Sequence, residues 1–148
     1  MKYLFSIYSL LILMSFQSCN HSESHIVFHP SHELSRVNTP FSAAVETENL
    51  LFLSGQIGKN HKTRHLVTGG VMAETEQVIQ NIKAVLAQHK LSLDNVIKCT
   101  VILKDINDLK DFNLVYASYF KKKPARTTFE ASALAGGARI EIDVIAAK

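Results

Sequence analysis

The chain of 148 residues lacks the motifs on which several protein classes depend. Its only cysteines, Cys19 and Cys99, are too few for a disulfide framework. It contains no C-x-x-C pair, no H-E-x-x-H motif, no glycine-rich nucleotide loop and no Ser-His-Asp spacing. No internal repeat stands out. We therefore expect neither a metal nor a cofactor in the functional site.

An excess of charge of one sign is also missing. The chain carries 16 lysines and arginines against 13 aspartates and glutamates, a formal net charge of +3. Only Lys2 among the first 18 residues is charged, so the remainder has a net charge of +2. This balance gives no support to a nucleic-acid partner or to an anionic membrane surface. The lysine run 121–123 is typical of a solvated loop.

The N-terminus holds the one long hydrophobic run, from Leu4 to Phe16, which follows a single positive residue. This pattern predicts a secretory signal peptide over residues 1–18 and is too short for a comfortable transmembrane helix. A small residue, Ser18, directly precedes Cys19, as in bacterial lipoprotein signals. We expect cleavage before Cys19 and a lipid anchor on it, which would place the protein in the cell envelope. An uncleaved anchor is the alternative.

Residues 19–38 are polar and are expected to form a tether. They contain four histidines near a spacing of four: His21, His25, His29 and His32. On a helix this spacing would suggest a metal site. Pro30 and the intervening serines oppose a stable helix, so a tether is favoured and metal binding by these histidines is the weaker alternative.

Residues 39–148 have the pattern of one α+β domain with a real core. Period-two alternation predicts strands, and apolar residues at steps of three and four predict two amphipathic helices, the second beginning near Asn107. We expect His89 at the end of the first helix and Cys99 as a small buried hydrophobe. The expected order is strand–strand–helix–strand–helix–strand–strand, over 42–47, 50–54, 71–89, 95–104, 107–120, 125–131 and 140–146.

The last two strands carry the candidate chemistry. Alternation places Arg126, Thr128 and Glu130 on one face of the first run, and Glu141 and Asp143 on one face of the second. If these runs pair across the small-residue turn between them, an arginine and a carboxylate can share one side of a sheet. The pattern alone favours a solvated face with a cross-strand ion pair over a functional site.

The segments Pro-Ala-Arg-Thr-Thr-Phe-Glu (124–130) and Arg-Ile-Glu-Ile-Asp-Val-Ile-Ala (139–146) closely resemble the C-terminal signature of the RidA family of enamine/imine deaminases. The similarity extends over roughly Pro40 to Lys148. It implies a chorismate-mutase-like α+β domain in which two helices lie on one face of a six-stranded sheet. It also implies a homotrimer with pockets at the subunit interfaces, acting on 2-imino acids.

The resemblance assigns roles to individual residues. Arg126 matches the family's carboxylate-binding arginine, whose planar fork suits a carboxylate at any working pH. Glu141 matches a glutamate that orients the attacking water, a task in which a carboxylate accepts and returns a proton. Backbone groups at Gly55 and Thr128 would orient the substrate, and Asn113 matches an asparagine near the pocket.

Some positions depart from the family pattern. Phe41 stands at a substrate-binding position where many relatives have tyrosine, so a hydroxyl contact is lost. Thr128 stands where many relatives have cysteine, and the loop before Pro124 is shorter. These departures are compatible with the reaction class that the resemblance implies, and they leave the substrate preference open.

Two functions remain open at this stage. The first is an imine deaminase, and the second is a non-catalytic module that binds a small carboxylate through Arg126. The presence of both Arg126 and Glu141 favours the enzyme. The localisation has two alternatives as well. The signal pattern predicts the cell envelope, and the resemblance implies the cytoplasm, as for most members of the family.

Overall fold

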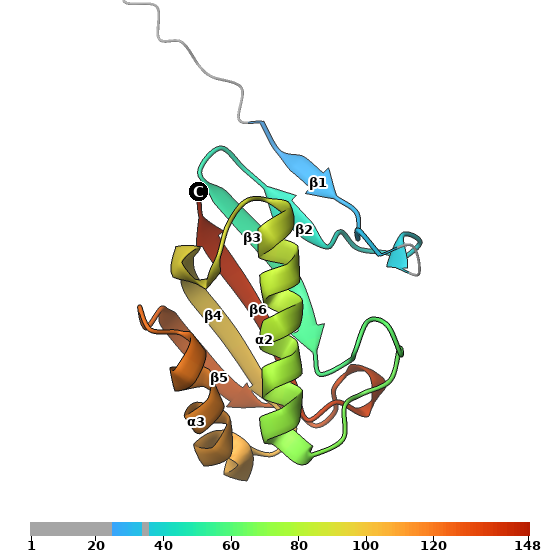
Figure 1. Cartoon of the computed structure of the whole chain (residues 1–148), viewed down its shortest axis with the longest axis vertical. Coiled ribbons are helices and arrows are strands. Elements are labelled where there is room, and N and C mark those ends of the chain that lie inside the picture. The colour runs from blue at the N-terminus through green and yellow to red at the C-terminus, as the bar shows by residue number, and fades with distance from the viewer. Residues whose placement is uncertain (1–24, 34–35) are drawn as a thin grey trace, which may run out of the picture.

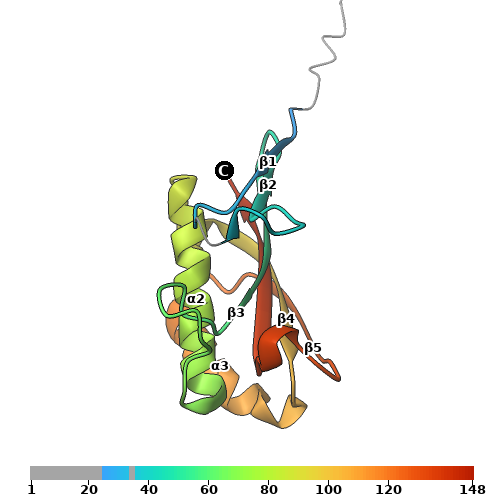
Figure 2. The same ribbon diagram turned by 90° about the vertical axis from the view of Figure 1, so that its right-hand side faces the viewer.

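The computed structural model describes residues 25–33 and 36–148. The predicted signal peptide and Cys19 lie outside these residues. Six strands form one mixed sheet in the order β1-β2-β3-β6-β4-β5, and helices α2 and α3 lie on the same side of it (Figures 1 and 2). The elements are β1 Val27–His29, β2 Ala44–Glu46, β3 Leu50–Ile57, α2 Gly70–Gln88, β4 Val96–Leu103, α3 Leu109–Tyr119, β5 Ala125–Glu130 and β6 Ile140–Ala147. Short 3₁₀ helices span Leu93–Asn95, Ile106–Asp108 and Ala135–Gly137.

The α+β fold class and the predicted order of elements from residue 42 onward are confirmed. Helix α2 has the predicted apolar stripe, and His89 is its C-cap residue. The start of the second helix differs from the prediction. Asp105, and not Asn107, supplies the capping oxygen, which accepts a hydrogen bond from the Asn107 N–H in a 3₁₀ turn ahead of α3.

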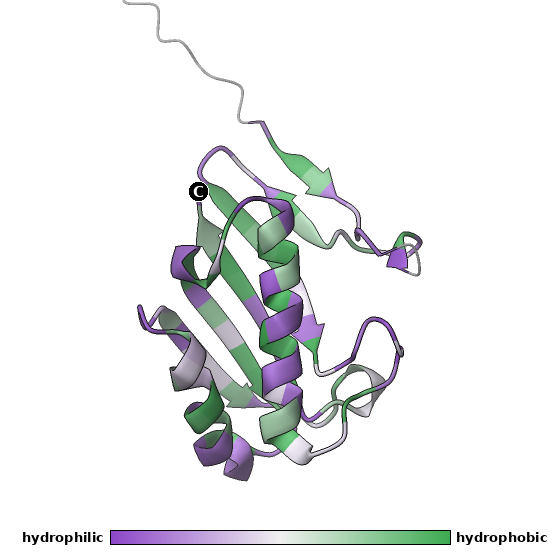
Figure 3. Cartoon of the chain, in the orientation of Figure 1, coloured by the Kyte–Doolittle hydropathy of each residue, from purple (hydrophilic) through white to green (hydrophobic). Residues whose placement is uncertain are grey.

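The core lies between the sheet and the two helices. Ile79, Ile82 and Leu86 of α2 are fully buried against the inward residues of the central strands, among them Ile142. Burial of each such side chain contributes roughly 1.5–3 kcal/mol relative to exposure. Cys99 is fully buried as predicted, and burial raises the pKa of its thiol. Hydrophobic residues follow the strands behind α2, whereas the loop between β3 and α2 is hydrophilic (Figure 3).

The sheet begins earlier than the predicted domain boundary at residue 39. Residues 27–29, expected to belong to the tether, form β1 and pair antiparallel with β2 in the register Val27↔Glu46 and His29↔Ala44. Three residues among histidines and serines give too short an alternation to be recognised as a strand. Within the described ranges, no helix combines the length and apolar character that a membrane span requires.

The two C-terminal strands do not pair with each other, so the pairing considered for these runs is not found. Strand β4 lies between them, parallel to β5 and antiparallel to β6. The connection passes over the end of β4, where the Ala131 N–H donates to the Leu103 carbonyl and the Lys104 N–H donates to the Arg139 carbonyl. These bonds direct the chain past β4 before β6 begins.

Candidate functional site

Strand β5 forms one edge of the sheet and presents Arg126 beside α3. The guanidinium carbon lies 4.8 Å from the ring centre of Tyr116 and 5.2 Å from that of Phe112, within cation–π range. Within the described part of the chain, no carboxylate lies at ion-pair distance from Arg126. The two rings hold the guanidinium in place while its hydrogen-bond donors remain available for a ligand.

Arg126 lines a surface cavity of about 520 Å³ together with Asn113 of α3. Lys121 and Lys123, from the loop before β5, add positive charge to its wall, and Tyr116 supplies an aromatic surface. This combination of an arginine fork, an amide and lysines suits a small anion such as a carboxylate. The structure therefore brings Arg126 and Asn113 together in one chain.

Thr128 extends this region along β5. It pairs with Val101, as Arg126 pairs with Cys99, and both partners are fully buried, so Thr128 and Arg126 share the face toward the helices. Within the described residues, the buried hydroxyl oxygen of Thr128 has no hydrogen-bond partner. A buried hydroxyl without a partner is costly, and a ligand could satisfy it.

A second region forms around Gly55, on the irregular stretch of β3 where the register with β6 shifts between Leu53 and Gln56. A Cβ atom at residue 55 would overlap Oε1 of Glu141. The carboxylate of Glu141 therefore lies directly against the backbone of Gly55. The structure therefore also brings Gly55 and Glu141 together in one chain.

Glu141 is half-buried, and its carboxylate forms no hydrogen bond or ion pair with any residue that the structure describes. Burial raises the pKa of Glu141, and the nearby charge of Asp143 raises it further. A carboxyl group that holds its proton more readily than usual is suited to take a proton from water and to return it.

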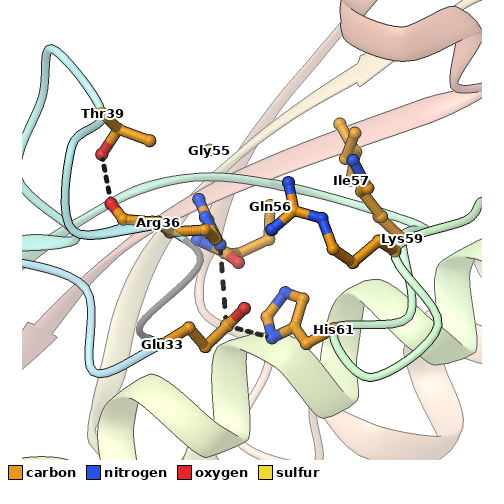
Figure 4. A pocket seen from close by; sticks show the side chains of 9 residues that line it. Glu33, Arg36, Thr39, Gly55, Gln56, Ile57, Lys59 and His61 are labelled. Atoms are coloured by element: carbon orange, nitrogen blue, oxygen red, sulfur yellow. Dashed lines mark hydrogen bonds and ion pairs between the residues drawn. The ribbon is translucent and has the colours of Figure 1, made fainter.

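Next to Gly55 lies a cationic cavity of about 240 Å³ that the sequence prediction missed (Figure 4). Arg36, Lys59, His61 and Arg64 line it, and Glu33 is its acidic member. Oε1 of Glu33 contacts Nδ1 of His61 and lies 3.9 Å from Nη1 of Arg36. The sequence feature that could have indicated this cavity is the basic loop after Ser-Gly-Gln. The local sequence pattern identifies that loop only as polar.

The protonation of the His61 ring affects the charge of this cavity. Burial lowers the pKa of His61, against the opposing effect of Glu33. Arg36, Lys59 and Arg64 therefore provide the positive charge beside Gly55 near neutral pH.

The remaining predicted site residue, Phe41, is half exposed. Its carbonyl accepts a hydrogen bond of 3.0 Å from Thr39, which also lines this cavity.

One chain does not bring its two candidate regions together. Arg126 aligns across the sheet with Cys99 and Val144, which face the helices, whereas Glu141 aligns with Ile102 and Phe129 on the opposite face. Arg126 and Glu141 therefore do not share one side of the sheet in a single chain, as direct pairing of their strands would have allowed. Strand β4 lies between β5 and β6 and pairs with both of them. In the resulting register, the side chains of Arg126 and Glu141 point to opposite faces of the sheet.

Comparison with known proteins identifies relatives over most of the chain. The model of the family described as Endoribonuclease L-PSP matches residues 32–148. A RutC family protein of Pyrococcus horikoshii is 47% identical over 110 residues, 74% of this chain and 87% of that protein. The human 2-iminobutanoate/2-iminopropanoate deaminase is 41% identical over 108 residues, 72% of this chain and 79% of that protein.

The fold is also shared with solved structures. A Rid-family protein of unknown function from Yersinia pestis superposes with a TM-score of 0.78 at 37% sequence identity. The match covers 84% of this chain and the whole of that chain. This agreement supports the six-stranded α+β architecture described above.

Proposed function

Because this chain belongs to the Endoribonuclease L-PSP (RidA) family, we propose that it is a deaminase that hydrolyses 2-imino acids and their enamine tautomers to 2-oxo acids and ammonia. The observation that carries the proposal is Arg126. Its guanidinium is held by two aromatic rings beside a cavity and has no carboxylate partner within the described residues. A substrate carboxylate supplies that missing partner.

Binding comes first in the proposed reaction. The two oxygens of the substrate carboxylate accept parallel hydrogen bonds from Arg126, while Asn113 and the backbone at Thr128 orient the rest of the molecule. The backbone of Gly55 and the side chain of Phe41, in the region around Gly55, enclose the substrate on its other side. Lysine at position 126 would keep the charge but would lose the fork.

Hydrolysis follows at the C=N carbon. Glu141 accepts a proton from water as the water oxygen bonds to this carbon, whose π electrons move to nitrogen. The same carboxyl group then returns the proton to nitrogen. As the C–N bond breaks and ammonia leaves, the remaining hydroxyl proton passes to the Glu141 carboxylate and the C=O bond of the 2-oxo acid forms. A protonated imine is already electrophilic, so this assistance suffices.

Both regions must meet for this chemistry, and we propose that a homotrimer brings them together at its subunit interfaces. Arg126 and Asn113 of one subunit would face Gly55 and Glu141 of the next. The free face of the sheet supports an interface because it exposes large apolar residues: Phe28, Phe52 and Phe129. The closed symmetry of homo-oligomers would place such a site at each interface.

The decisive experiment measures ammonia release by the full-length protein, with imines generated in place by an amino-acid oxidase. We expect the wild type to accelerate release. Arg126→Ala should lose nearly all of this acceleration, and Arg126→Lys should lose most of it, with the oligomer intact in both. Full activity in Arg126→Ala would contradict the carboxylate-clamp role.

The alternative function is a binding module that holds a small carboxylate without turnover. The separation of Arg126 from Glu141 within one chain favours this alternative if the subunits do not assemble as proposed. Calorimetric titration with a 2-oxo acid distinguishes the two functions. Binding that depends on Arg126, with no ammonia release from any imine, would identify the module.

A further inference from the structure

Three side chains that can bind a metal ion meet at the edge of the sheet opposite Arg126. His29 comes from β1, Glu46 from β2, and His89 from the C-cap of α2. Nε2 of His29 lies 2.7 Å from Oε2 of Glu46, and Nδ1 of His89 lies 3.7 Å from the same oxygen. All three candidate ligand atoms lie within 4.8 Å of one another. Figure 1 shows β1, β2 and the C-terminal end of α2 at the same end of the molecule.

These distances fit a tetrahedral ion. Nitrogen and oxygen ligands at about 2.0–2.2 Å from zinc are separated from each other by roughly 3.3–3.5 Å. The two separations from Oε2 lie on either side of this range, and all three pairs lie within 4.8 Å, so side-chain shifts of roughly 1 Å would bring the ligands to tetrahedral spacing. Two imidazoles and one carboxylate are also a ligand set that zinc accepts.

A neighbouring lysine fixes the orientation of the Glu46 carboxylate. Nζ of Lys148 lies 2.9 Å from Oε1 of Glu46, so the ammonium holds one carboxylate oxygen and the other faces the two imidazoles. Such a contact to a ligand's second atom is typical of metal sites. The imidazole rings of His29 and His89 meet edge to face with their centres 4.5 Å apart.

The site is partly shielded from solvent. The side chain of His89 is 14% exposed and that of His29 is 31% exposed. Both line a cavity of about 250 Å³.

We propose that His29, Glu46 and His89 bind one divalent transition-metal ion, for which zinc has the best fit, with water as the fourth ligand. The ion would join the short edge strand β1 to the end of α2. Any proton on a ligating imidazole nitrogen would leave to solvent as the metal bonds form. This site is independent of the imine site and uses none of its residues. It differs from a site formed only by the histidines of residues 19–38, because Glu46 and His89 belong to the folded domain.

Zinc chloride titrated into the metal-stripped full-length protein tests the proposal. Calorimetry should give one ion per chain. His29→Ala and His89→Ala should each weaken binding at least about tenfold. Glu46→Gln keeps the side-chain volume but removes the charge, and it should weaken binding as well. His65→Ala is the matched control, because His65 is exposed in a loop away from the cluster, and it should bind as the wild type does.

Two further readouts separate a folded site from loose binding by the N-terminal segment. Saturating zinc should raise the Tm of the wild type by roughly 5–10 °C and leave that of His89→Ala nearly unchanged, because all three ligands come together only in the folded chain. Cobalt in place of zinc should give the visible absorption of a tetrahedral site in the wild type alone. Unchanged zinc affinity in His89→Ala, or no binding at micromolar zinc, would overturn the proposal.

Discussion

Gly55 and Glu141 lie on neighbouring strands so closely that a Cβ atom at residue 55 would overlap Oε1 of Glu141. The contact forms where β3 departs from a regular ladder with β6. An irregular ladder of this kind re-aims the groups next to it, and the absent side chain leaves space for a carboxylate. The resemblance to RidA proteins predicts that each residue is functional, and the structure places the two in contact.

Gly55→Ala should therefore displace the carboxylate of Glu141. We expect kcat/KM for imine hydrolysis to fall at least about tenfold with the fold retained, because the obstructing atom is the flexible end of a side chain. Steady-state kinetics and circular dichroism measure the two effects. If the glycine acts through Glu141, adding Gly55→Ala to Glu141→Gln should cause little further loss. Additive losses would assign Gly55 a separate role.

The pH dependence of activity should report the raised pKa of Glu141. Activity that needs the ionised carboxylate is lost as pH falls through this pKa, so the acid limb of kcat/KM should lie above the range of an ordinary glutamate. Asp143→Asn removes a neighbouring negative charge and should move this limb to lower pH. An unmoved limb would show that another group controls it.

Stability should change in the opposite direction to activity in Glu141→Gln. A carboxyl group with a raised pKa in the folded state favours folding while it is protonated, and this contribution is lost as pH rises through that pKa. The glutamine variant should therefore have a higher Tm than the wild type above neutral pH and a similar Tm in acid. A lower Tm throughout would mean that the charged carboxylate stabilises the fold.

The proposed assembly can be tested on the face of the sheet away from the helices. Phe52 lies on this face with 38% of its surface exposed, so Phe52→Glu should place charge in the interface and dissociate the oligomer. Sedimentation and ammonia release should decline together. Met72→Glu is the matched control, because Met72 is 43% exposed on α2, a helix that contributes no residue to the proposed site. A trimer that persists in Phe52→Glu would place the interface elsewhere.

The predicted lipid anchor depends on Cys19, which lies outside the described residues. Cys19→Ala should release the protein from membranes, because acylation at this cysteine is the proposed attachment. Cell fractionation and mass spectrometry of the wild-type chain provide the measurements. Unchanged membrane association, with no lipid on Cys19 in the wild type, would reject the assignment.

The sequence was sufficient for most of the elements and for the family. The apolar stripe over Val71, Val78, Ile82, Val85 and Leu86 predicted α2 within a residue at each end, because helical periodicity is a local property. The motifs around Arg126 and Glu141 were specific enough to predict the six-stranded α+β fold. The edge strand β1 was missed, because three residues carry too little pattern and are held by pairing with β2.

Tertiary structure alone decided how the functional groups are arranged. Alternation within β5 and β6 gives the faces of each strand, but their relation depends on which strand lies between them and in what register. Strand β4 takes that place and puts Arg126 and Glu141 on opposite faces, so the proposed site needs a second subunit. The meeting of His29 with Glu46 and His89 has the same origin. Contacts between residues distant in the chain follow from packing and strand register, which no local spacing encodes.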